Sequence, residues 1–231
     1  MKNDAYFYTI DMNTIMRITV ITLILFGLLS IDFVGLSLSE TVAVVPGMLL
    51  LVALVDTIII AYAINRSRWH RWRLIAAVFV IFYSLTTLLV GVETLYLGDI
   101  LPPEQVYRLF LNGAIAAAIF SPLVVLAFGR LTTRVSGIPG SGGQVAVSWR
   151  FWPVKLAFLA VFWVILFVAF GLLVFTPLVN ALDPAALDFY TDLEMPPWIL
   201  LFQAGRGVAL AGLALLIISM IRGRRWQVGL V

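Results

Sequence analysis

The sequence predicts an all-α membrane protein, a bundle of about six transmembrane helices with both termini on the inner, cytoplasmic side. Composition is the first observation behind this prediction, since 62% of the 231 residues are hydrophobic and only 12% are charged. Soluble domains have about 45–50% apolar and about 25% charged residues, because polar groups must cover their surface. The other two observations are the gathering of apolar residues in six runs and the placement of basic residues on one side.

The six apolar runs are long enough to cross a membrane. A hydrocarbon core about 30 Å thick needs roughly 20 helical residues. A segment in lipid must also satisfy its own backbone hydrogen bonds, which favours helices, and the alternating pattern of a β-barrel is absent from the sequence. The predicted helices cover approximately residues 18–38, 46–65, 74–97, 108–129, 155–179 and 198–221.

Charge or proline marks the boundaries of the first three runs. The first starts after Arg17 and is too long for the apolar region of a signal peptide. Pro46 opens the second run, which ends before the basic stretch 66–73, and the third run ends before Asp99. We therefore expect the first run to be a membrane helix rather than a cleaved leader.

The last three runs are separated by a proline pair and by two longer segments. Pro102 and Pro103 precede the fourth run, and the acidic segment 180–197 precedes the sixth. A glycine-rich inner segment, residues 130–154, links the fourth and fifth runs and lacks the Walker phosphate-binding pattern. We interpret it as a flexible linker within a single polytopic membrane domain, residues 1–231, in which a division into two three-helix halves is also considered.

Basic residues fix the predicted orientation. With the N-terminus inside, the inner segments hold 13 of the 15 basic residues, whereas the outer loops hold only Arg108 and the sixth run contains Arg206. Such an excess of Lys and Arg on the cytoplasmic side is typical of multi-pass proteins. An odd number of helices would place some of these basic segments on the outer side, so the charge distribution favours an even number. The inner basic residues are Lys2, Arg17, Arg66, Arg68, Arg71, Arg73, Arg130, Arg134, Arg150, Lys155, Arg222, Arg224 and Arg225.

The inner segment between the second and third runs is the most basic part of the chain. It contains Arg66, Arg68, Arg71 and Arg73, interleaved with tryptophan. Arginines at this depth are expected to contact anionic lipid headgroups, although the need to set the topology explains them equally well. His70, the single histidine, lies in the same segment and is expected to be a solvated or headgroup-facing side chain.

Six polar residues are predicted to lie within the helices, in the outer half of the membrane. A charge at the bilayer centre costs at least about 2.5–3.5 kcal/mol, so these side chains are expected to pair or to reach water. Arg206 is the only cation at this level, and its planar fork can bind one carboxylate or bridge two. Asp56 by depth and Glu93 by reach are its nearest expected partners. The six residues are Asp32, Asp56, Glu93, Asn112, Gln203 and Arg206.

Three classes of function are open. In a small-solute permease or permease subunit, the polar residues would line a cavity that opens to the outside. In a structural or assembly protein, a buried ion pair would lock helix packing. In an intramembrane enzyme, a carboxylate pair could run acid–base chemistry, but the sequence has no cysteine and no nucleophile, metal or cofactor motif. We therefore expect no catalytic residue, no metal and no cofactor.

Four short segments carry a resemblance. They are Arg66-Ser67-Arg68-Trp69, Glu93-Thr94-Leu95-Tyr96, Ser121-Pro122-Leu123 through Gly129-Arg130, and Gln203-Ala204-Gly205-Arg206-Gly207. They are similar to strings in an uncharacterised group of bacterial polytopic membrane proteins. The resemblance implies a bacterial plasma-membrane protein and gives no activity. It also marks Glu93 and Arg206 as positions of interest, and it implies that one or more helices can follow Val231.

These features define the expected surroundings of the protein. We expect a multi-pass protein in the lipid bilayer of the plasma membrane, in contact with anionic headgroups. A second copy of the chain or a partner membrane subunit is the expected protein contact. The net charge of +3 is explained by the inner basic residues, so nucleic acid is not expected as a partner.

Overall fold

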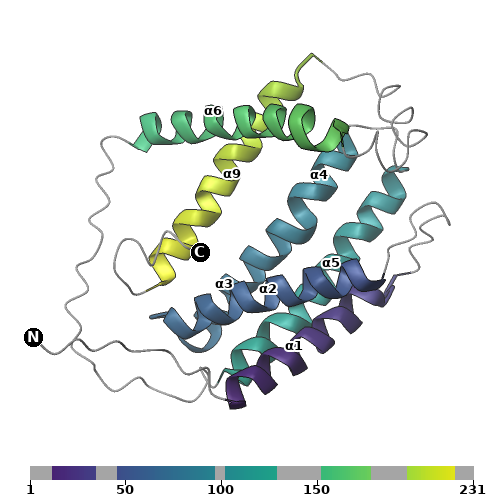
Figure 1. Ribbon diagram of the computed structural model, residues 1–231, viewed down its shortest axis with the longest axis vertical. Coiled ribbons are helices and arrows are strands. Elements are labelled where there is room, and N and C mark those ends of the chain that lie inside the picture. The colour runs from purple at the N-terminus through teal and green to yellow at the C-terminus, as the bar shows by residue number, and fades with distance from the viewer. Residues whose placement is uncertain (1–11, 35–45, 97–101, 129–151, 178–196, 222–231) are drawn as a thin grey trace, which may run out of the picture. The chain divides into compact units, whose positions relative to one another are not determined.

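A computed structural model describes residues 12–34, 46–96, 102–128, 152–177 and 197–221 (Figure 1). Within these ranges 91% of the residues are helical and none belongs to a strand, which confirms the predicted all-α class. Six helices in the described ranges are long and apolar enough to cross a membrane, as the sequence predicts. The orientation with both termini inside remains a prediction.

The first two helices are α1 (Met12–Ser30) and α2 (Pro46–Arg66). Helix α2 has nearly the predicted bounds, but α1 starts before Arg17 and ends at Ser30, well short of the predicted residue 38. The chain leaves the helix because two backbone N–H groups beyond Ser30 bond to side chains. The Val34 N–H donates to Asp32 Oδ1 at 3.1 Å, and the Phe33 N–H donates to Asn112 Oδ1 at 2.8 Å. Such local side-chain bonds compete with the helical ladder.

The third span consists of three segments that follow one another without a break. They are α3 (Arg71–Tyr83), the π-helical turn η1 (Ser84–Leu88) and α4 (Leu89–Tyr96). The π-turn holds one residue more than an α-helical turn would, and Thr86 Oγ1 donates to the Phe82 carbonyl at 2.7 Å beside it.

Helix α5 (Pro103–Ala127) is the fourth span and packs against α1 and the third span. It starts at Pro103, where the missing N–H of proline is tolerated in the first helical turn. Helix α1 packs against α2 and α5, and α3 packs against α5 (Figure 1). The rings of Phe82 and Phe120 meet at the contact of α3 with α5, 4.9 Å apart between centroids.

Small residues bring the third span close to α5. A methyl group on Gly113 would collide with the Thr87 side chain, and one on Gly91 would collide with the Phe110 ring. The third span and α5 therefore approach each other at two glycines, Gly91 of α4 and Gly113 of α5. Close approach through small residues is a common means of helix packing in membranes, where no hydrophobic effect drives helices together.

The described helices divide into two compact units. The first unit contains α1 to α5 together with Met220 and Ile221, and the second contains α6 (Trp152–Phe170), the π-helical turn η3 (Gly171–Phe175) and α9 (Ile199–Met220) up to Ser219. The expected division into two three-helix halves is therefore wrong, because α5 packs with α1 and α3. The expected linker, residues 130–154, lies outside the described residues except for its last three, which begin α6.

Helix α6 is apolar on all sides. Ala160 is its one buried residue within the described range, whereas large side chains such as Phe158, Ile165 and Phe170 are exposed. A helix that is hydrophobic all round is stable only in an apolar surrounding. Lipid supplies that surrounding in a protein of this composition.

Candidate functional site

Asp32 lies just beyond the end of α1, and Asn112 lies within α5 close to the same place. Asp32 follows the end of α1 at Ser30 and is exposed, so its predicted place within a helix is wrong. Asn112 is half-buried and accepts the Phe33 N–H, which ties the end of α1 to α5. The contact gives Asn112 a structural role, because it satisfies a backbone donor that the helix no longer serves.

Asp56 and Glu93 are half-buried within the spans of the first unit. Asp56 lies near the middle of α2, and Glu93 lies in α4, close to its end. Next to Asp56, Thr57 is fully buried and its hydroxyl has no hydrogen-bond partner within the described ranges. Thr22 on α1 is also buried, and its hydroxyl likewise has no hydrogen-bond partner in the described part of the chain. Nothing in the sequence distinguishes these two threonines, because isolated threonines are ordinary in membrane helices.

Gln203 and Arg206 join Trp163 in a polar cluster of the second unit, here called the Trp163 cluster. Gln203 is fully buried, and the Trp163 indole N–H donates to its Oε1 at 3.2 Å. The Arg206 guanidinium lies over the Trp163 ring, with Cζ 5.8 Å from the ring centroid. The amide thus holds the indole, and the indole face holds the guanidinium through a cation–π contact.

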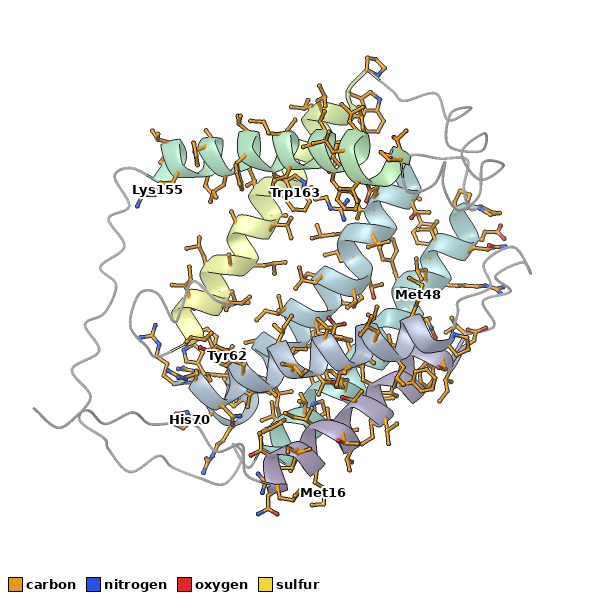
Figure 2. The ribbon with its side chains drawn as sticks, in the orientation of Figure 1. Met16, Met48, Tyr62, His70, Lys155 and Trp163 are labelled. Atoms are coloured by element: carbon orange, nitrogen blue, oxygen red, sulfur yellow. The ribbon has the colours of Figure 1, made fainter. Side chains whose placement is uncertain are left out.

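The local sequence explains why these three side chains meet. Gln203 and Arg206 are three residues apart and Gly207 is the next residue, so all three share one face of α9. A methyl group on Gly207 would lie 2.8 Å from Trp163 Cβ and 3.1 Å from Ala160 Cα. Glycine therefore lets α9 approach α6 at Trp163, which Figure 2 shows near the crossing of the two helices.

Trp163 was missed by the sequence analysis, although a signal existed. Tryptophan is usually found at the membrane interfaces, yet Trp163 lies in the middle of the most apolar span. A buried indole N–H needs an acceptor. A tryptophan in the middle of a span thus indicates a polar partner on a neighbouring helix.

The chemistry of the Trp163 cluster suits a planar anion. The guanidinium has five N–H donors in a fixed, planar fork that matches the geometry of a carboxylate. The described ranges contain no group of three His, Cys, Asp or Glu side chains that could hold a metal ion.

The six predicted residues belong to two different units. Asp32, Asp56, Glu93 and Asn112 belong to the first unit, and Gln203 and Arg206 belong to the second. The pairing of Arg206 with Asp56 or Glu93 remains a prediction. The four arginines predicted to face the inner side surround the turn between α2 and α3. Arg71 and Arg73 are exposed there, and Arg66 and Arg68 are half-buried.

Comparison with known proteins adds no relative. No protein-family model, curated protein or solved structure matches the chain. The resemblance to a group of bacterial membrane proteins stays a prediction, and function is argued from the residues alone.

Proposed function

We propose that the protein is a small-solute permease of a bacterial plasma membrane, or a membrane subunit of one, and that the Trp163 cluster binds a solute carrying a carboxylate. The observation that carries the proposal is the fixed position of the Arg206 guanidinium over the Trp163 ring. A cation within a span is expensive to maintain, and such residues commonly mark solute pathways. A guanidinium held by its neighbours loses little conformational freedom when it binds a carboxylate.

A structural lock is the second candidate. It is favoured by the full burial of Gln203 and by the close approach of α6 to α9 at Gly207. In that case the three polar groups would serve only to satisfy one another and to fix the register of the two helices. The two candidates differ in whether Arg206 responds to a solute.

The first test measures thermal unfolding of the detergent-purified protein with a panel of small mono- and dicarboxylates, each beside its neutral amide. We expect at least one carboxylate, and not its amide, to raise the Tm of the wild-type protein. A ligand at 100 times its Kd stabilises the folded state by about 2.7 kcal/mol, which is readily measured. Uptake of that carboxylate into proteoliposomes then tests transport.

Three variants locate the response. Arg206→Gln should abolish the shift in Tm, and Arg206→Lys should weaken it, because an ammonium keeps the charge but lacks the fork. Arg108→Gln is the matched control, since Arg108 is an exposed arginine of α5 in the first unit. The proposal is wrong if no carboxylate stabilises the protein or if Arg206→Gln keeps the full shift. A strong coupling between Trp163→Phe and Gln203→Leu without any ligand effect would establish the lock.

A further inference from the structure

The turn between α2 and α3 carries a dense group of basic residues. From Thr57 to Val92 the sequence contains four arginines and no Asp or Glu. We call this surface the turn patch. It consists of Arg66, Arg68, Trp69, Arg71, Trp72 and Arg73.

The exposed part of the turn patch combines charge with an aromatic ring. Arg71, Trp72 and Arg73 are all exposed, and Trp72 exposes 70% of its surface. The Arg73 Cζ lies 5.8 Å from the centroid of the Trp72 ring. On the other side of the turn, the Arg66 Cζ lies 5.6 Å from the ring of Tyr62, and Figure 2 shows Tyr62 and His70 near this end of the helices.

The backbone that carries the turn patch is held by hydrogen bonds. The Trp69 N–H donates to Ser67 Oγ at 2.9 Å, and the Arg68 N–H donates to the Met220 carbonyl at 2.9 Å. Ser67 itself is buried and pairs with Ile221 in an isolated antiparallel bridge. The arginines therefore project from a fixed backbone, which lowers the entropy lost when they bind a ligand.

We propose that the turn patch is a binding site for the phosphate of an anionic phospholipid headgroup, with Arg71 and Arg73 as its main contacts. Guanidinium groups bind phosphate through paired, charge-assisted hydrogen bonds. The exposed Trp72 ring suits the boundary between headgroups and acyl chains, where amphipathic rings are favoured. Setting the topology would require only positive charge, whereas this surface also exposes a tryptophan ring with the Arg73 Cζ 5.8 Å from its centroid. The inference is independent of the proposed solute site, because the turn patch belongs to the first unit.

The test compares phosphatidylglycerol with phosphatidylcholine of the same acyl chains, added to the detergent-purified full chain. Orientation in a membrane plays no part in this measurement. Native mass spectrometry should show preferential retention of phosphatidylglycerol by the wild-type protein. In Arg71→Gln/Arg73→Gln the preference should fall by about five-fold for each arginine removed. Glycerophosphoglycerol, the free headgroup, should not displace the lipid at equal concentration, because it lacks the chains that seat Trp72.

The matched control is Arg17→Gln/Lys155→Gln, which removes the same charge from two exposed basic residues elsewhere. It should keep the wild-type preference. Equal loss in both double variants would show a general effect of net charge and would overturn the proposal, as would equal retention of the two lipids by the wild-type protein. Displacement by the free headgroup would overturn it in favour of a site for soluble phosphate esters. If the glutamine double variant does not fold, Arg71→Lys/Arg73→Lys replaces it. Its preference for phosphatidylglycerol should lie between that of the wild-type protein and an equal retention of the two lipids.

Discussion

Trp163 and Gln203 illustrate how polar side chains are accommodated within a span. An unpaired amide or indole N–H in hydrocarbon costs several kcal/mol. The hydrogen bond of 3.2 Å between Trp163 Nε1 and Gln203 Oε1 removes part of that cost from both groups. A change at either residue therefore affects the other, and Arg206 rests on the ring that this bond fixes.

The buried threonines of α1 and α2 give a prediction for stability. The hydroxyls of Thr22 and Thr57 are buried without a hydrogen-bond partner in the described ranges. Valine has the same shape, and a buried hydroxyl without a partner costs about 1–3 kcal/mol. Thr22→Val and Thr57→Val should therefore raise the Tm of the purified protein.

Thr86→Val is the control for the two threonine variants. The Thr86 hydroxyl donates to the Phe82 carbonyl at 2.7 Å, so its removal should lower the Tm or leave it unchanged. A drop in Tm for Thr57→Val, as large as for Thr86→Val, would mean that the Thr57 hydroxyl has a partner such as bound water.

At the scale of single residues, the sequence pointed to a candidate site only where a polar residue lies within an apolar run. Gln203 and Arg206 stand out because they are polar within an apolar run, and the structure places both at a helix crossing. Trp163 does not stand out, because its indole counts as apolar although it carries a donor. The predicted place of Asp32 within a helix was wrong, because α1 ends at Ser30 and the Val34 N–H bonds to the Asp32 side chain. The apolar content of the segment does not reveal such a bond.

At the scale of the helices, composition located each span but not its ends. Five of the six predicted spans overlap the observed helices nearly completely, whereas α1 is displaced toward the N-terminus. Helix ends depend on which side chains bond to the free backbone groups. For α1 one of those partners is Asn112, which is 79 residues from Phe33 in the chain. A contact so distant in the chain cannot be predicted from the residues around Ser30.

The crossing of α6 and α9 gives a prediction at this scale. A methyl group on Gly207 would lie 2.8 Å from Trp163 Cβ and 3.1 Å from the Ala160 backbone, which cannot easily move. Gly207→Ala should therefore lower the Tm and weaken any solute response of Arg206. Overpacking of this kind typically costs about 1–3 kcal/mol.

Two other glycines of α9 serve as controls. A methyl group on Gly205 or Gly212 would meet no atom within 4 Å in the described part of the chain. Alanine stabilises a helix by about 0.8–1.0 kcal/mol relative to glycine in isolated helices, so Gly205→Ala and Gly212→Ala should leave the Tm unchanged or raise it. If all three variants behave alike, the Gly207 contact does not limit the approach of the helices.

For the whole molecule, the orientation in the membrane is a prediction that rests on the distribution of basic residues. Six spans and basic inner segments agree with both termini inside. The division into two units could not be predicted from the sequence, because it depends on α5 packing with α1 and α3 rather than with the next helix in the chain.

Single cysteines test the orientation directly, because the chain contains none. Trp72 and Tyr107 are suitable positions, since they expose 70% and 63% of their surfaces at opposite ends of the first unit's spans. In intact cells a membrane-impermeant maleimide should label Tyr107→Cys and not Trp72→Cys. Both should be labelled after permeabilisation, which controls for folding and exposure. Labelling of Trp72→Cys alone in intact cells would reverse the orientation.

The π-helical turn η1 acts as a phase shift between the two halves of the third span. One extra residue rotates everything after Leu88 by about 100° about the helix axis, the angle of a single residue. Gly91 consequently points where Val90 would point in an unbroken helix. Because even a methyl group there would collide with the Phe110 ring, the insertion allows glycine, and not a β-branched side chain, to meet α5. The same rotation sets the direction in which Glu93, the one acidic residue of this span, points. The π-turn that precedes it in the chain therefore decides which face of the helix carries the carboxylate.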